Sequence, residues 1–391
     1  MKKTLTFLCC ICLTFVFFIK SSFAFSSDAK YAVLIDGNSG QVLYEKNADV
    51  KMVPSSMSKL MTIYLAFELL KSGDIKLQDK FLVSENAWRK EGSRMFLKPN
   101  SYVSVEDLLR GVIVQSGNDA SVVLAEGIAG NEQDFVDLMN HKASVLGLKN
   151  SHFANATGLP HNQHKMSSKD IATLSMKIQK DFPEFYHHFG QKSFTFNKIT
   201  QHNRNSLLSK SFGVDGLKTG HTDIAKYGIA VSAIKGDRRL FVVVNGLKNE
   251  KLRDDAVAKL LVYGFNSFAN IYISPQQVLG EVDVVGGKEK VAKLVSNKEI
   301  AITVPRVFKG SNKIQVQHPP KLQAPVDKDT AIGKMTIILY NGQNHEYKLY
   351  PFSNIEKSNL IYRLWFRIKG LFSVFSSSKT NNEDKIIYLK A

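Results

Sequence analysis

One lysine in an apolar segment constrains the fold of this chain more than any other feature. The segment "VPSSMSKLMTIYLAFELL", residues 53–70, has the composition of a buried helix and carries Lys59 near its start. Desolvating an ammonium group is costly, so lysine is almost never fully buried without a partner. Either Lys59 extends to water, or the fold holds its amine inside with a lowered pKa. The second interpretation makes Lys59 a candidate general base.

The Ser-x-x-Lys spacing around this lysine is weak alone, because it occurs four times in the chain. The four pairs are Ser27 and Lys30, Ser56 and Lys59, Ser232 and Lys235, and Ser376 and Lys379. On a helix an amine reaches a hydroxyl one turn back, whereas on a strand residues three apart point to opposite faces. Only Ser56 opens a strongly apolar helix, predicted over 56–71, which favours it as a nucleophile. Taken alone, the pair still fits an exposed lysine with its stem on apolar surface.

Two further motifs follow in chain order. "QSGNDA" places Ser116 and Asn118 at a break between two helices predicted within 105–129, where a hydroxyl relays protons and an amide orients a substrate carbonyl. "DGLKTGHT" places Lys218, Thr219 and Gly220 on a predicted strand, where lysine attracts a carboxylate and glycine admits a ligand backbone. Alone, Ser116 fits a helix N-cap and Lys218 an exposed strand cation. The order of the three motifs carries the specificity.

The succession of elements predicts an α+β domain followed by a small all-β domain. A hairpin within 31–46, helices between 56 and 180, late strands and a helix at 251–263 indicate one antiparallel sheet that pairs the two ends of the first domain. From about residue 274, short alternating strands separated by Gly, Pro and Asn turns follow. We expect a signal peptide at 1–24, a catalytic domain at 25–270, a β domain at 271–353, an amphipathic helix at 354–376 and a polar, loose tail at 377–391.

The N-terminus predicts secretion. Lys2 and Lys3 precede a 16-residue apolar run, and "SSFA" ends at Ala24, the layout of a cleavable signal; an uncleaved anchor is the alternative. All three cysteines lie in that run, so the mature chain would have no disulfide, thiolate metal site or cysteine nucleophile. Removing the signal lowers the formal net charge from +17 to +14, which suits nucleic acid, anionic lipid or an anionic wall polymer.

The segment "NLIYRLWFRIKGLFSVFS" has a helical pattern with one apolar face. Eight large apolar residues fall within one arc: Leu360, Ile361, Leu364, Trp365, Ile368, Leu371, Phe372 and Phe375. Trp and Phe beside basic residues are typical of a helix that lies in the plane of an anionic membrane surface. A helix docked on the protein's own core is the alternative. The segment has too many charges to span a bilayer.

The three motifs together form the constellation of the penicillin-recognising serine enzymes. Segments such as "SRMFLKPNSYVSVEDLLRGVIVQSGNDAS", "VDGLKTGHTD" and "LLVYGF" resemble the D-alanyl-D-alanine carboxypeptidases among the low-molecular-mass penicillin-binding proteins, over about residues 28–375. The resemblance implies a serine transpeptidase/β-lactamase-like domain, the small β domain and a C-terminal amphipathic helix. It also implies a periplasmic enzyme that is peripherally anchored to the outer face of the inner membrane, acts on peptidoglycan stem peptides and is acylated by β-lactams.

The resemblance assigns the roles of the family's catalytic residues to the residues of this chain that occupy the same motif positions. The serine at the position of Ser56 is acylated by a stem peptide ending in D-Ala-D-Ala, the terminal D-Ala leaves, and water releases the shortened peptide. The resemblance makes Lys59 the general base, with Ser116 and Asn118 in proton relay and substrate orientation. The remaining residues of the site are Lys218, Thr219, Gly220 and His221 on the strand side, and Arg253 for the terminal carboxylate. Backbone N–H groups of Ser56 and His221 form the oxyanion hole in this interpretation.

Other functions stay open at this stage. A class A β-lactamase uses a glutamate to activate water, and no Glu-x-x-x-Asn lies between Asn118 and Lys218. A module that is acylated without turnover has the same motifs. His161 and His164, and the adjacent His187 and His188, raise the question of a metal, but no thiolate or HExxH set accompanies them. We therefore expect no metal, no cofactor and no nucleic-acid partner.

Overall fold

The N-terminal part of the chain is built on one antiparallel sheet. The structure, a computed structural model, describes residues 25–359 and 385–390. The strand order is β2-β1-β9-β8-β7, so the first hairpin pairs with the late strands, as the sequence predicted. The strands are β1 (Tyr31–Asp36), β2 (Val42–Lys46), β7 (Val214–Thr222), β8 (Lys226–Lys235) and β9 (Arg238–Leu247).

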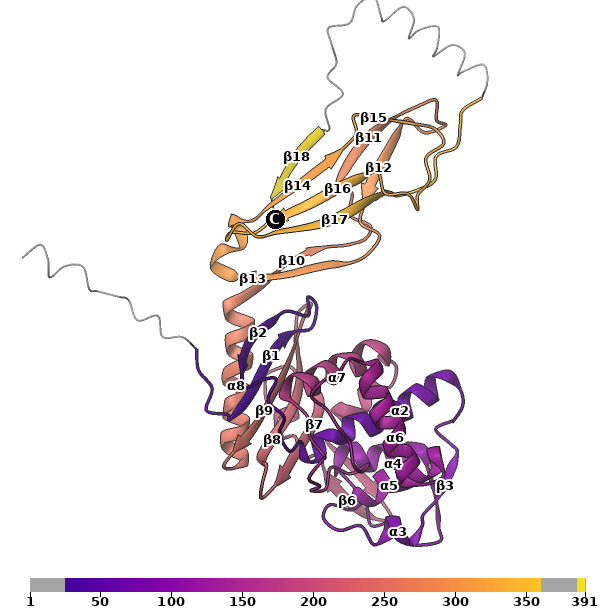
Figure 1. Cartoon of the computed structure of the whole chain (residues 1–391), viewed down its shortest axis with the longest axis vertical. Coiled ribbons are helices and arrows are strands. Elements are labelled where there is room, and N and C mark those ends of the chain that lie inside the picture. The colour runs from indigo at the N-terminus through magenta and orange to yellow at the C-terminus, as the bar shows by residue number, and fades with distance from the viewer. Residues whose placement is uncertain (1–24, 360–384, 391) are drawn as a thin grey trace, which may run out of the picture.

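Helices cover both faces of this sheet (Figure 1). On one face α8 (Glu250–Ser267) packs through Leu260 and Leu261 against Leu240 and Val242 of β9. A thicker helical layer covers the other face. It contains α2 (Lys59–Ser72), α3 (Glu85–Trp88), α4 (Val105–Val114), α5 (Asn118–Ala129), α6 (Glu132–Val145) and α7 (Ser168–Asp181).

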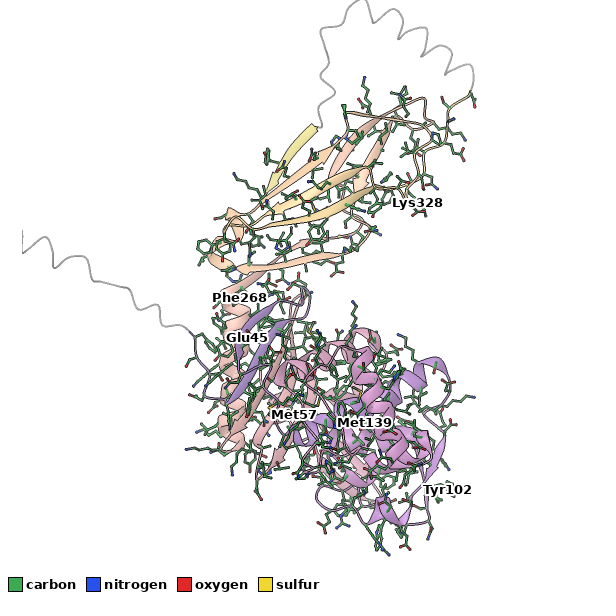
Figure 2. The ribbon with its side chains drawn as sticks, viewed as in Figure 1. Glu45, Met57, Tyr102, Met139, Phe268 and Lys328 are labelled. Carbon is green, nitrogen blue, oxygen red and sulfur yellow. The ribbon has the colours of Figure 1, made fainter. Side chains whose placement is uncertain are left out.

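The helix α2 lies at the centre of the helical layer. Every residue from Lys59 to Phe67 is buried, so the helix is enclosed on all sides. It ends at Gly73, whose left-handed φ of 84° provides the C-cap that the sequence predicted. The α-helix begins at Lys59 rather than at the predicted residue 56, because a 3-10 turn, η1 (Ser55–Ser58), precedes α2. Figure 2 labels Met57 and Met139 in the interior of this layer.

Short elements connect these layers. Two small hairpins are β3 (Lys80–Leu82) with β4 (Tyr102–Ser104), and β5 (Ser193–Phe196) with β6 (Ile199–His202). Two 3-10 turns, η2 (Tyr186–Gly190) and η3 (Ser206–Ser209), flank the second hairpin. The segment 182–213 therefore brings the chain back from the helical layer to the edge strand β7.

The C-terminal domain consists of strands, as the alternating pattern predicted. A seven-stranded sheet has the order β15-β11-β12-β17-β16-β14-β18, and a separate pair joins β10 and β13. Apolar residues of both sheets, among them Ile271, Leu294 and Val316, form one core. The elements are β10 (Phe268–Ile273), β11 (Gly280–Val285), β12 (Val291–Val295), β13 (Ile300–Pro305), η4 (Arg306–Ser311), β14 (Lys313–His318), β15 (Lys321–Gln323), β16 (Gly333–Ile338), β17 (Asn344–Pro351) and β18 (Lys385–Lys390).

A buried polar network ties the two domains together where α8 leads into β10, near Phe268 in Figure 2. Asp36 at the end of β1 is fully buried and pairs with Arg238 at 2.8 Å. Its other oxygen accepts from Asn270 Nδ2 of β10 at 3.2 Å, and Asn270 Oδ1 accepts from Thr303 of β13 at 3.0 Å. The Thr303 hydroxyl also lies 2.6 Å from Ser39 Oγ. Because buried charges need such partners, this network fixes the junction.

The C-terminal tail differs from the expected loose segment. Residues 385–390 form β18, which pairs antiparallel with β14 from His318↔Lys385 to Lys313↔Lys390. The edge of β14 offers unpaired backbone groups, and the "IIYL" run has high strand propensity, which explains the pairing. The predicted signal peptide and residues 360–376 of the predicted amphipathic helix lie outside the described residues. The described start of that prediction, residues 354–359, is not helical, because Ile355 pairs with Val326 and Lys357 pairs with Gly287 in isolated β-bridges. Within the described part of the chain, no helix is long and apolar enough to cross a membrane.

Candidate active site

Segments far apart in the sequence meet around one pocket of about 390 Å³. Its walls come from η1, the loop before α5, the residues after β6, strand β7 and the start of α8. The lining residues are Ser56, Gly92, Ser93, Ser116, Arg204, Thr219, Gly220, His221, Tyr227, Glu250 and Arg253. The sequence-predicted residues Lys59, Asn118 and Lys218 lie behind this wall and are buried.

Lys59 meets Ser56 one turn back, as the helical spacing predicted. Its Nζ lies 2.9 Å from Ser56 Oγ, while Ser56 itself is only partly buried and lines the pocket. The same nitrogen donates to Asn118 Oδ1 at 2.7 Å and to the Thr157 carbonyl oxygen. Lys59 is fully buried. The amine therefore has three polar neighbours from three parts of the chain and no access to water.

The electrostatics of the site favour the neutral amine. The pKa of Lys59 is lowered to about 7, mostly by burial and in part by the nearby Arg204, while Asp119 opposes the shift. A neutral amine has two N–H donors and one lone pair. The donors match the oxygens of Asn118 and Thr157, which leaves the lone pair facing the Ser56 hydroxyl. This geometry is that of a base poised to remove the serine proton.

The break between α4 and α5 projects Ser116 into the pocket. Ser116 has a left-handed φ of 65°, an uncommon conformation for a residue with a side chain, and its Oγ is buried without a hydrogen-bond partner among the described residues. Unsatisfied buried hydroxyls and left-handed backbones both cost free energy and cluster at functional sites. Ser116 is thus available to a reacting group, and it is not the N-cap of α5, which is Gly117.

Asn118 is held at both ends of its amide. Its Oδ1 accepts from Lys59 and its Nδ2 donates to the Glu91 carbonyl at 2.5 Å. The next residue, Asp119, accepts backbone N–H groups of Met95 at 2.8 Å and Leu97 at 3.2 Å. These bonds fasten the 91–97 loop, which supplies pocket residues, to the start of α5.

Strand β7 forms the opposite wall and approaches η1 closely. A Cβ at Gly220 would lie 2.9 Å from the Pro54 carbonyl oxygen and 3.3 Å from the Met57 nitrogen, so only glycine allows this approach. Thr219 lines the pocket, and the His221 ring packs against Tyr227 with centroids 4.1 Å apart and ring planes tilted by 35°. The backbones of Ser56 and His221 therefore lie on adjoining walls.

Three further cations surround the pocket: Lys218, Arg253 and Arg204. Lys218 is 2% exposed and its Nζ donates to the Thr219 carbonyl at 3.2 Å; burial, then Lys59, Arg204 and Arg253, lower its pKa well below the usual value. Arg253 is 2% exposed and its Nε donates to Asp254 at 3.0 Å. Its buried Nη2 lies 2.9 Å from the same oxygen without hydrogen-bond alignment. This concentration of positive charge suits an anionic ligand group.

The alternative motifs have structural explanations. Ser84, which begins a second Ser-x-Asn sequence ending at Asn86, is the N-cap of α3 and accepts from the Ala87 N–H at 3.0 Å. Ser232 is buried in β8 against Arg239, and its motif partner Lys235 is exposed. Ser27 accepts from the Ala29 N–H. No group of three metal-binding side chains occurs among the residues that the structure describes, and His164 instead accepts from the Ala154 N–H.

Sequence reasoning missed several residues that the pocket uses. The Thr157 carbonyl and the Arg204 side chain belong to loops that carry no motif, and only the three-dimensional structure brings them to Lys59 and the pocket. Asp119 had a signal in the sequence, since an acid in the first turn of a helix favours local N–H groups. Its contacts with Met95 and Leu97 are 24 and 22 residues away and were not predictable.

Comparison with known proteins identifies the family. Residues 19–249 match the D-alanyl-D-alanine carboxypeptidase family, and residues 271–357 match the C-terminal domain of penicillin-binding protein 5. The chain belongs to the D-alanyl-D-alanine carboxypeptidase family. The carboxypeptidase DacC of Escherichia coli is 39% identical over 350 residues, which cover 87% of each chain. DacA of the same organism is 37% identical over 88% of each chain.

Solved structures of the carboxypeptidase family agree with the fold over both domains. Penicillin-binding protein 5 of Haemophilus influenzae superposes with a TM-score of 0.76 at 38% identity, covering 85% of this chain and 99% of that one. Penicillin-binding protein 6B of Escherichia coli gives a TM-score of 0.70 at 35% identity, covering 84% and 96%. The expected fold, an α+β serine-peptidase domain followed by an all-β domain, is therefore confirmed.

We expect Arg204→Gln to raise the pKa of Lys59. A positive charge near an amine disfavours the ammonium form, so removing it moves the titration midpoint above about 7. A pH titration of the assigned Lys59 ζ-nitrogen by NMR measures this shift. The matched control is Lys98→Gln, which removes an exposed cation outside the pocket lining. An unchanged or lowered midpoint in Arg204→Gln would contradict the electrostatic account of the site.

Proposed function

We propose that this chain is a serine-type DD-carboxypeptidase that removes the terminal D-Ala from peptidoglycan stem pentapeptides. The observation that carries the proposal is the buried Lys59 amine, with a pKa of about 7, placed 2.9 Å from Ser56 Oγ at the pocket wall. The names of the relatives agree with this proposal, since several are D-alanyl-D-alanine carboxypeptidases that match most of this chain.

The reaction begins with attack of Ser56 Oγ on the carbonyl carbon between the two D-Ala residues. Lys59 Nζ takes the serine proton, and the backbone N–H groups of Ser56 and His221 receive the developing oxyanion. The peptide C–N bond then breaks, and the leaving amine gains a proton through Ser116, whose hydroxyl has no other partner in the described structure. Hydrolysis of the resulting ester releases the shortened peptide and restores Ser56.

Recognition of the substrate relies on charge. The terminal carboxylate of D-Ala-D-Ala meets Arg253, Lys218 and Thr219, of which Arg253 is held by Asp254. Asn118 orients the substrate from the opposite side, since Oδ1 retains a second lone pair beyond its bond with Lys59. The exposed Arg204 adds positive potential at the pocket mouth. A β-lactam presents the same carboxylate and a reactive carbonyl, so it acylates Ser56 and blocks the site.

The protein acts in the periplasm in this proposal. Residues 1–24 have the layout of a cleavable signal, and residues 360–376 have the pattern of an amphipathic helix, which would lie on the outer face of the inner membrane. The β domain then separates the active site of the catalytic domain from the membrane.

We expect Ser56→Ala to abolish covalent labelling by a fluorescent penicillin and release of D-Ala from a pentapeptide, because the variant lacks the attacking hydroxyl. Mass spectrometry of the peptide reports the loss of one D-Ala, and near-ultraviolet circular dichroism reports the fold. The matched control is Ser27→Ala, which has the same Ser-x-x-Lys spacing outside the pocket. Persistent labelling of Ser56→Ala would refute the proposal, and labelling of the intact chain without D-Ala release would refute turnover.

We expect the mature full-length chain to bind anionic vesicles and a chain ending at Ser353 to remain unbound. Burying the large apolar residues of the predicted arc contributes about 1.5–3 kcal/mol each at full burial. Lys357, Arg363, Arg367 and Lys369 add attraction to anionic lipid that weakens with salt. Liposome flotation measures binding, and the truncated form should keep its carboxypeptidase activity on small substrates. Equal flotation of the two forms would contradict the anchor.

A further inference from the structure

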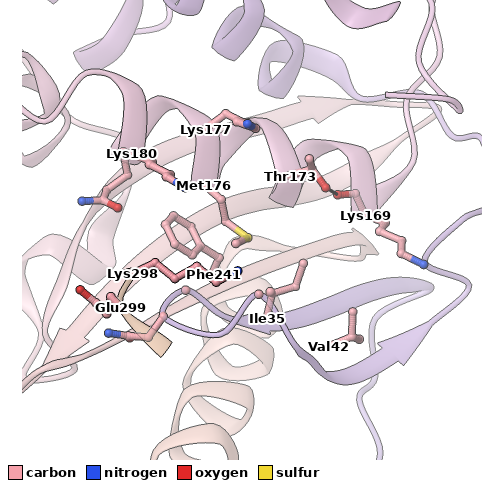
Figure 3. A pocket seen from close by; sticks show the side chains of 14 residues that line it. Ile35, Val42, Lys169, Thr173, Met176, Lys177, Lys180, Phe241, Lys298 and Glu299 are labelled. Atoms are coloured by element: carbon pink, nitrogen blue, oxygen red, sulfur yellow. Dashed lines mark hydrogen bonds between the residues drawn. The ribbon is translucent and has the colours of Figure 1, made fainter. Parts of the chain in front are cut away.

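A second pocket lies at the junction of the two domains, apart from the active site. It measures about 760 Å³, within the usual range of ligand sites, and shares no lining residue with the pocket of Ser56. Its walls are α7, the turn between β1 and β2, strand β9 and the loop between β12 and β13 (Figure 3). The loop belongs to the C-terminal domain, so a ligand here would touch both domains.

The floor of this junction pocket is apolar. Ile35 and Val42 come from the first hairpin, Phe241 from β9 and Met176 from α7. Figure 3 shows Met176 and Phe241 facing each other in the space between the helix and the sheet. Such a floor favours a ligand that carries apolar groups beside any charges.

The rim of the junction pocket is basic. Lys169, Lys177 and Lys180 come from α7, and Lys298 comes from the β12–β13 loop. Lys169 pairs with Asp49 at 3.1 Å, whereas the other three have no carboxylate within ion-pair distance in residues 25–359 and 385–390. Three uncompensated ammonium groups around an apolar floor attract anions into the pocket.

The lone acid of the rim does not cancel these charges. Glu299 lines the pocket beside Lys298 and accepts a hydrogen bond from the Tyr272 hydroxyl. The side-chain amide of Gln179 also lines the pocket and has no partner in the described chain, so it offers donors and an acceptor to a peptide group.

The arrangement of the lysines favours separated carboxylates over a phosphate. Lys177 and Lys180 lie three residues apart on α7, and Lys298 lines the same pocket from the other domain. Phosphate sites typically use converging N–H groups at a helix N-terminus, but Lys180 lies in the last turn of α7, where the helix dipole disfavours an anion close to the backbone. Ammonium groups at the tips of long side chains receive single carboxylates instead.

We propose that the junction pocket binds a short acidic peptide whose carboxylates alternate with apolar side chains. The carboxylates pair with Lys177, Lys180 and Lys298, and the apolar side chains contact Met176 and Phe241. Bound peptide would contact both domains and add a second bridge beside the polar network of Asp36 and Asn270. The same chemistry occurs in wall stem peptides and in acidic segments of partner proteins.

Calorimetric titration of the mature chain with acetyl-Glu-Leu-Glu-Leu-Glu-amide tests the site. The double variant Lys177→Glu/Lys180→Glu should weaken binding by about tenfold or more, because charge reversal opposes the anion at short range. The matched control Lys80→Glu/Lys149→Glu changes two exposed lysines away from the pocket and should change the dissociation constant by less than about twofold. Raising the salt concentration should weaken binding to the unaltered chain.

Further measurements distinguish a wall stem peptide from a protein segment as the bound peptide, and they show which results would contradict the proposal. Tighter binding of a disaccharide-tripeptide wall fragment than of the L-peptide assigns the site to stem peptides, and the reverse order assigns it to a protein segment. Equal binding of the Gln-Leu-Gln-Leu-Gln counterpart, equal losses in both double variants, or tighter binding of poly(glycerol phosphate) would each overturn the proposal. Penicillin labelling of Ser56, retained in every variant, keeps this test independent of the proposed function.

Discussion

The site is organised around the fully buried amine of Lys59. A buried amine without water must find polar partners, and here they are Ser56 from η1, Asn118 from α5 and the Thr157 carbonyl from a loop. These partners oblige three segments to meet at one atom. Burial, with the nearby Arg204, lowers the pKa of this amine to about 7, and no carboxylate among its hydrogen-bond partners stabilises the charged form.

The positive charges of the pocket serve binding and chemistry together. In the proposed reaction, Arg204, Lys218 and Arg253 attract the terminal carboxylate of the substrate, and Arg204 also disfavours the ammonium form of Lys59. Asp119 opposes the lowering of the Lys59 pKa. It also holds the 91–97 loop in place by accepting hydrogen bonds from the backbone N–H groups of Met95 and Leu97. The cationic arrangement that is proposed to bind an anionic substrate thus also favours the neutral amine of Lys59 near physiological pH.

Local patterns in the sequence were sufficient to predict the motif-bearing elements. Ser56 and Lys59 follow helical spacing, Ser116 occupies a helix break, and Lys218 lies on a strand. These elements were predictable because each depends on neighbours within a few residues. No local pattern predicted the positions of Arg204 and the Thr157 carbonyl or the two hydrogen bonds that hold the Asn118 amide, because these depend on contacts across dozens of residues. Pairing of β18 with β14 likewise required the sheet edge, which the tail sequence alone does not reveal.

The most direct test of this account is the pH dependence of acylation at Ser56, measured in single turnover with a chromogenic penicillin. If neutral Lys59 is the base, the acylation rate should rise about tenfold per pH unit at low pH and level off above a midpoint near 7. Lys59→Arg, which keeps the charge but does not deprotonate, should be slow at every pH. A rate that is independent of pH from 5 to 8, or that rises with a midpoint near 10, would contradict a neutral buried lysine as the catalytic base.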